Sequence, residues 1–109
     1  MFTSSYRLSG NDPNAVAISR GVPKGYTGRR YYRLAPRSWA MVKEPREDVF
    51  REQFGQQLAE LDAHAVMEEL GPDAILLCWE APGTFCHRRL VAEWLERETG
   101  VPVPELEVS

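Results

Sequence analysis

Residues 74–99, AILLCWEAPGTFCHRRLVAEWLERET, carry the strongest indications of the fold. Residues 74–79 form a mostly apolar run, which is typical of a central strand buried on both faces of a parallel sheet. A proline and a glycine in residues 81–85 predict a tight connection. The stretch from about 85 to 99 predicts a helix with Thr84 as its N-cap and an apolar core face. This strand–turn–helix unit favours an α/β fold.

The rest of the chain alternates the same kinds of element. Short β-compatible or apolar runs indicate strands, and apolar residues recurring every three or four positions indicate helices. Strands are predicted at residues 2–8, 15–19 and 31–34, and helices at residues 47–62 and 63–70. Asp62 is expected to cap the second of these helices. We therefore predict a single α/β domain over residues 1–109, a mostly parallel sheet with helices packed on it.

The composition restricts the class of protein. A chain of 109 residues accommodates one hydrophobic core, and none of its apolar runs approaches the ~20 residues of a membrane span. The first ten residues lack the basic and apolar regions of a secretory signal. We therefore expect a cytoplasmic protein whose two cysteines are thiols and not a disulfide. Oligomeric state cannot be deduced from the sequence.

The charge is unevenly distributed along the chain. Residues 1–46 contain nine Lys/Arg and two Asp/Glu, a balance of +7, whereas residues 47–109 contain four and fourteen, a balance of −10. Such a division can mark a basic face that binds phosphates. The alternative, which we favour slightly, is that the two halves fold against each other.

The turn after residues 74–79 carries the best candidates for chemistry. Cys78 falls at the carboxyl end of the predicted strand, where ligands bind in open α/β sheets. Cys86 is expected in the first turn of the following helix, where the dipole stabilises a thiolate. His87 is then a candidate proton carrier and Arg88 a candidate anion-binding cation, and Glu80 lies on the same turn. These residues predict a site that combines a thiol with anion binding.

Each of these residues also has a purely structural interpretation. Cys78 is more simply a core residue, because free cysteine is often buried. His87 could cap the helix or face solvent, and Arg88 could pair with Glu80 or Glu93. The eight-residue spacing of the cysteines does not match the paired spacing of structural zinc sites. We therefore predict neither a metal nor a cofactor.

A basic, aromatic loop forms a second candidate site. Residues 20–30 hold three glycines and several cations, and the candidates for ligand contact are Arg20, Tyr26, Arg29 and Arg30. Cations mixed with aromatic residues suit phosphates and stacked bases. The competing interpretation is a surface loop whose arginines pair with the acidic second half. A recognisable nucleic-acid-binding motif is missing, so the loop alone is weak evidence.

Two segments resemble the bacterial family called domain of unknown function 488. Residues 76–95, LLCWEAPGTFCHRRLVAEWL, are similar to its signature, in which a strand ending in Cys, an aromatic and Glu leads to Cys-His-Arg on a helix. Residues 17–36, AISRGVPKGYTGRRYYRLAP, resemble the start of its shorter members. The longer members have an Asp-x-Arg segment, and here Ile18 stands in the place of its Asp. The resemblance implies a compact α/β fold. It marks as site positions Arg20, Cys78, Glu80, Cys86, His87 and Arg88.

Two functions follow from these residues. The first is an enzyme acting on a phosphorylated or nucleotide-like substrate, with Cys86 as nucleophile or redox thiol, His87 as proton carrier, and Arg88 with Arg20 as the anion clamp. The second is a non-catalytic module that binds a phosphate or nucleic acid through the same turn and the basic loop. We rank the enzyme slightly ahead.

Overall fold

The computed structural model describes residues 1–80 and 85–106. Its elements in chain order are β1 (Phe2–Ser5), α1 (Tyr6–Ser9), β2 (Ala15–Ala17), β3 (Arg29–Arg30), the 3-10 helix η1 (Tyr32–Leu34), α2 (Trp39–Val42), α3 (Glu47–Ala59), α4 (Ala63–Leu70), β4 (Ile75–Cys78) and α5 (His87–Thr99). None of the helices in the described ranges is long and apolar enough to cross a membrane.

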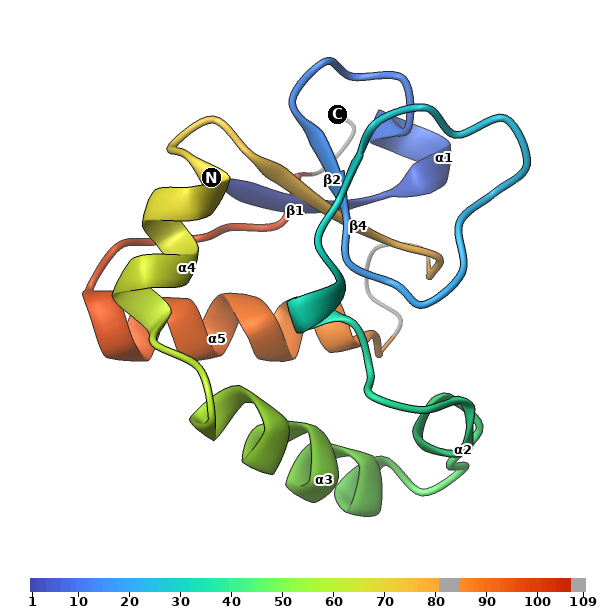
Figure 1. The fold of residues 1–109 in the computed structure, drawn as a ribbon, viewed down its shortest axis with the longest axis vertical. Helices are drawn as coiled ribbons and strands as arrows, with labels where there is room; N and C mark the ends of the chain where they lie inside the picture. Colours follow the sequence, from blue (N-terminus) through green and yellow to red (C-terminus); the bar gives the residue numbers. More distant parts are fainter. Residues whose placement is uncertain (81–84, 107–109) are drawn as a thin grey trace.

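The strands form one parallel sheet in the order β1-β4-β2-β3, with β4 between β1 and β2 (Figure 1). All four residues of β4 are buried. This confirms the predicted small α/β domain with a parallel sheet, and it confirms residues 75–78 as a central strand. Because every strand runs the same way, their carboxyl ends meet at one edge, which we call the carboxyl edge.

Both faces of the sheet are covered. Helices α3, α4 and α5 lie together on one side (Figure 1), and their apolar residues form the larger core with Val16 and Leu76. The neighbouring strand residues point to the other face, because side chains alternate along a strand. There Ala17 and Leu77 pack with Tyr6 of α1, and Tyr26 of the basic loop lies against them. Burial on both faces explains the continuous apolar runs of β2 and β4.

One predicted strand was wrong and another was too long. Residues 31–34 are not a strand: η1 occupies 32–34, and the short strand β3 lies just before it. The pairing of β3 with β2 ends with the bond from the Tyr31 N–H to the carbonyl of Ala17. At the N-terminus the strand stops at Ser5, because the Ser5 side chain accepts from the Leu8 N–H and begins α1.

The helix boundaries also differ in detail from the predictions. Asp62 caps α4 as predicted, by accepting from the N–H of Ala65. The helix predicted over residues 47–62 is shorter: α3 ends at Ala59, with Glu60 as its C-cap residue. The short helix α2 was not predicted. The last helix begins at His87, because Cys86 has an extended backbone and is the N-cap residue, not a first-turn residue. The proposed cap Thr84 lies outside the described residues.

Candidate functional site

The carboxyl edge of the sheet holds a cavity of about 390 Å³, which we call the carboxyl-edge pocket. This volume is within the range of small-molecule sites. Its lining comes from the residues that follow β2, from α2 and α3, and from both sides of the β4–α5 connection. The polar, sulfur-containing and tryptophan side chains on its wall include Arg20, Trp39, Cys78, Trp79, Glu80, Cys86 and His87.

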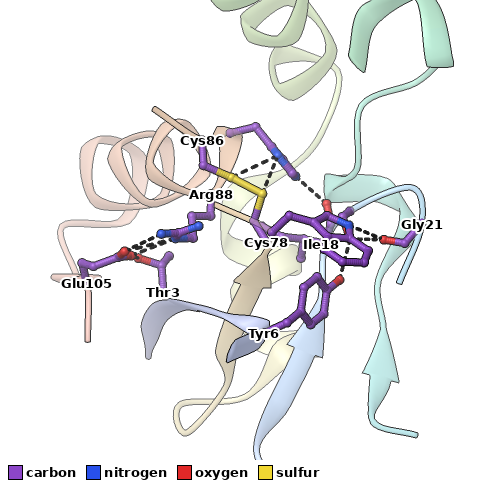
Figure 2. Close-up of a disulfide and its surroundings, with 11 residues drawn as sticks. Thr3, Tyr6, Ile18, Gly21, Cys78, Cys86, Arg88 and Glu105 are labelled. Carbon is purple, nitrogen blue, oxygen red and sulfur yellow. Dashed lines mark hydrogen bonds and ion pairs between the residues drawn. A yellow bond between two sulfur atoms is a disulfide. The ribbon is translucent and has the colours of Figure 1, made fainter. Parts of the chain in front are cut away.

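The two cysteines are joined in a disulfide (Figure 2), so the prediction that they are thiols is wrong for this structure. Cys78 ends β4 and Cys86 precedes α5, and each is 4% exposed. The strand end and the helix start bring together the sulfurs of two cysteines that are eight positions apart in the sequence. The cysteine pair lines the carboxyl-edge pocket. Cys78 is therefore buried, as its structural interpretation predicted, and it also lies at the candidate site.

His87 packs directly against this disulfide. Its Nδ1 lies 3.3 Å from the Cys78 sulfur and 3.8 Å from the Cys86 sulfur. Its Nε2 is 2.5 Å from the carbonyl oxygen of Ile18, the residue after β2. Burial lowers the pKa of His87 to about 4. The hydrogen bond to Ile18 raises this pKa, and the positive charge of Arg88 lowers it further. His87 is therefore neutral at pH 7, and neither a solvent-facing residue nor a side-chain helix cap.

The tautomer of His87 follows from its contacts. A carbonyl oxygen only accepts hydrogen bonds, so the proton of the neutral ring must be on Nε2. The lone pair of Nδ1 then points at the two sulfur atoms. The hydrogen bond to Ile18 therefore orients the imidazole so that its Nδ1 can accept a hydrogen bond from, or act as a metal ligand beside, the cysteine pair.

Arg20 supplies a cation to the wall of the same pocket. Its Nη1 donates to the carbonyl oxygens of Pro36 and Arg37, at 3.3 and 2.8 Å. Its guanidinium carbon lies 5.4 Å from the centre of the Trp39 ring, a cation–π arrangement. Its Nε is buried and has no hydrogen-bond partner among the residues that the structure describes. Arg20 is thus positioned by backbone carbonyls and retains donor capacity.

Two tryptophans complete the pocket. Trp39 and Trp79 are each more than half exposed, and the indole N–H of Trp79 donates to the carbonyl of Gly21 at 2.9 Å. Trp39 was not among the predicted site residues, and neither was Trp79. Its position directly after Cys78 at a strand end was the signal that could have identified it.

Arg88 does not contribute to this pocket. Its side chain is buried and directed toward Glu105 and Thr3 (Figure 2). Its Nη2 and Nε donate to the Glu105 carboxylate at 2.7 and 3.1 Å. Burial would raise the pKa of Glu105, but hydrogen bonds from Arg88 and Thr3 outweigh it and hold that pKa below its usual value. The predicted anion clamp and the predicted pairing with Glu80 or Glu93 are therefore both replaced by this ion pair.

Apart from Arg20 and Gly21, the basic loop does not line the carboxyl-edge pocket. Arg29 donates to the carbonyl oxygens of Leu70 and Glu69 at the end of α4, and Tyr26 donates to the carbonyl of Arg29. Arg30 is exposed and stacks on the Tyr32 ring. Both arginines are exposed, but Arg29 is engaged in hydrogen bonds and Arg30 in a ring contact within the chain.

The two oppositely charged halves also contact each other, through the ion pairs Arg33–Glu69 and Arg37–Glu60. This supports the interpretation that the charge division reflects folding of one half against the other. Of the nine predicted site residues, the pocket thus gathers five, namely Cys78, Glu80, Cys86, His87 and Arg20. The four that it does not gather are Arg88, Arg29, Arg30 and Tyr26.

Comparison of the chain with protein-family models, with curated proteins and with solved structures gives no match. The resemblance to the domain of unknown function 488 family therefore stays a prediction. The chemistry of the carboxyl-edge pocket must be judged from its own residues.

Proposed function

We propose that this protein is a thiol-dependent enzyme that acts on a phosphorylated or nucleotide-like small molecule in the carboxyl-edge pocket. One observation carries the proposal. The cation Arg20, stacked on Trp39, lines the same cavity as Cys78, Cys86 and His87. A binding group for an anion and a potential nucleophile therefore share one ligand-sized space.

The wall of the pocket suits a ligand that combines a phosphate with a planar aromatic group. Arg20 lines the pocket and is held through its Nη1 by two carbonyl oxygens, so the rest of its guanidinium can donate hydrogen bonds to a phosphate. The exposed rings of Trp39 and Trp79 offer flat apolar surfaces on which a base can stack. This combination favours nucleotides over simple inorganic anions.

The cysteine pair supplies the reactive group once it is reduced. In the cytoplasm, where we place the protein, a dithiol reductant converts the disulfide to two thiols and is itself oxidised to a disulfide. Cys86 then lies at the N-terminus of α5, where the helix dipole favours its thiolate, while the Cys78 thiol can donate to Nδ1 of His87.

The covalent step uses the Cys86 thiolate as the nucleophile. Its sulfur forms a bond to an electrophilic carbon or phosphorus of the substrate, and the leaving group departs with the electron pair of the broken bond. The leaving group takes up its proton from solvent water, and Glu80 is the carboxylate that lines the same pocket. Arg20 holds the charged end of the substrate throughout.

The binding half of the proposal is tested with adenosine monophosphate as the probe, in the presence of a dithiol reductant and a chelator. We expect quenching of tryptophan fluorescence on binding and at least tenfold weaker binding in Arg20→Ala. Arg33→Ala removes an exposed arginine outside the pocket and is the matched control. Absence of binding at millimolar nucleotide, or equal loss in both variants, would contradict the proposal.

The thiol half is tested by alkylation of the reduced protein with iodoacetamide, resolved by peptide mass spectrometry between pH 5 and 9. We expect Cys86 to react with an apparent pKa below the ~8.5 of a free thiol, and the nucleotide to slow its reaction. A Cys86 that stays protected at every pH is a core residue, and that result would exclude it as the nucleophile.

The alternative function, a non-catalytic phosphate- or nucleic-acid-binding module, is favoured by one observation. A second cavity, of about 360 Å³, combines Arg7 and Lys24 with the rings of Tyr26 and Trp79. This function predicts salt-sensitive binding of an oligonucleotide that Lys24→Ala weakens and Cys86→Ser leaves unchanged. Binding that is insensitive to salt would exclude it.

A further inference from the structure

Three potential metal ligands converge at the end of β4 and the start of α5. The Sγ atoms of Cys78 and Cys86 and the Nδ1 of His87 all lie within 4.8 Å of one another. From this cluster we infer that the reduced protein binds one zinc ion through Cys78, Cys86 and His87. The inference goes beyond the proposed function, because zinc binding requires the reduced cysteine pair but no substrate.

The first argument is the orientation of the imidazole. The Ile18 carbonyl, 2.5 Å from Nε2, keeps the proton on that atom and directs the lone pair of Nδ1 toward both sulfurs. Metal-bound histidines commonly show this pattern, with the second ring nitrogen donating to a backbone carbonyl or carboxylate. The two disulfide sulfurs carry no hydrogen to donate to Nδ1. In the reduced protein this lone pair can accept from the Cys78 thiol, and zinc would replace the thiol proton as its partner.

The second argument is the spacing of the ligand atoms. With zinc–sulfur bonds of about 2.3 Å and zinc–nitrogen bonds of about 2.0 Å, tetrahedral angles place a sulfur and a nitrogen about 3.5 Å apart. The two observed Nδ1–sulfur distances, 3.3 and 3.8 Å, lie on either side of this value. Reduction lets the two sulfurs separate to the roughly 3.8 Å that the same geometry requires. The backbone can therefore stay nearly where it is.

The third argument is the charge of the site. A dithiol reductant transfers two electrons to the disulfide, two protons are taken up, and the reductant becomes a disulfide. Zinc binding then releases both thiol protons, so that a dication, two thiolates and a neutral imidazole sum to zero. A neutral complex suits side chains that are only 4 to 7% exposed.

The ligand set also selects the metal and its role. Two thiolates and one imidazole are ligands that zinc prefers over magnesium or calcium. All three residues line the carboxyl-edge pocket, so the fourth coordination position faces the cavity. Three protein ligands with an open fourth position are typical of catalytic and not of structural zinc sites. Zinc would be bonded to the sulfur of Cys86, the proposed nucleophile. The zinc-bound form and the form with a reactive thiol therefore exclude each other.

The experiment is a zinc titration of the reduced, reductant-free protein under nitrogen, with a chromogenic chelator as competitor. We expect one zinc per chain in the reduced protein and none in the oxidised protein, which has the same sequence and is the matched control. His87→Ala should weaken binding at least 100-fold, and His64→Ala, which removes the exposed histidine, should leave it unchanged. Equal affinity in the two variants, or in the two redox states, would overturn the inference.

A second measurement does not depend on any variant folding. Cobalt(II) added to the reduced wild-type protein should give a sulfur-to-cobalt charge-transfer band, which zinc then displaces, and zinc should protect both cysteines from alkylation. Lack of the band, or alkylation unaffected by zinc, would refute the site. Nucleotide binding is measured with a chelator present, so failure of the zinc site and failure of the proposed function are distinguishable.

Discussion

The buried ion pair between Arg88 and Glu105 provides the sharpest test of the structure. Replacement Glu105→Gln keeps the size of the side chain and one acceptor oxygen but removes the negative charge. The Arg88 side chain is 1% exposed and that of Glu105 14%. Arg88 donates to both carboxylate oxygens, and its Nη1 has no partner within the described parts of the chain. The substitution therefore leaves a buried guanidinium without its counter-charge.

The magnitude follows from this geometry. Breaking a buried ion pair by removing one partner costs about 3–5 kcal/mol. We expect about 3 kcal/mol here, at the lower end of that range, because Glu105 is partly exposed and glutamine still accepts one hydrogen bond. Thr3, which donates to the Glu105 carboxylate at 2.5 Å, loses a charged acceptor as well.

The assay is equilibrium unfolding of the oxidised protein in urea at pH 7. Glu93→Gln, an exposed carboxylate on α5, is the control, and we expect its effect to stay within about 0.5 kcal/mol. The loss in Glu105→Gln should persist in 1 M salt, because buried pairs are poorly screened. A loss below about 1 kcal/mol, or one that salt removes, would refute the reasoning that Glu105 supplies the counter-charge that the buried Arg88 requires.

Three further predictions concern stability. Because the pKa of His87 is about 4 in the folded oxidised protein and about 6.5 when unfolded, its contribution is complete above pH 6.5 and is lost as the pH falls toward 4. Urea unfolding should show a loss of about 3 kcal/mol over that range, and His87→Gln should abolish this part of the pH dependence. Reducing the Cys78–Cys86 disulfide in chelator should lower the unfolding free energy by about 2.5 kcal/mol, since the bond closes a loop of about nine residues; no change in the urea midpoint would contradict it. Gly100→Ala should destabilise by about 1 kcal/mol, because Gly100 ends α5 with φ of 76°. Gly55→Ala, in the exposed middle of α3 with open space around the added carbon, should stabilise slightly; equal effects of the two substitutions would argue against the αL cap.

Much of the fold could be predicted because its signals are local. The apolar run of β4, the apolar stripe of α3 and the Asp62 cap each depend on residues close in sequence, and all three were confirmed. The 31–34 segment was misassigned because a short β-compatible run does not distinguish a strand from a 3-10 turn. Its conformation depends on which backbone groups β2 leaves free to pair, which is a tertiary property.

The candidate site was only partly predictable for the same reason. Cys78, Cys86 and His87 are close in sequence, and their grouping at a strand-to-helix turn was expected. The role of Arg88 was misjudged because Glu105 lies 17 residues further on, in a tail without periodicity. Arg20 was predicted as part of the anion clamp, but no local signal indicated that it and Trp39 line the same cavity as the cysteines.

By itself, the sequence determined the α/β class, the central strand, the main helices and the turn at which a ligand site was to be expected. Apolar periodicity, caps and breakers act over a few residues, so they can be read along the chain. Only the tertiary structure decided that the cysteines meet as a disulfide, that Ile18 sets the tautomer of His87, and that Arg88 is withdrawn into the core. Each of these depends on distances between segments that are far apart in the sequence or joined across a turn. The electrostatic and chemical state of a side chain follows from what surrounds it in space, and local sequence does not contain that information.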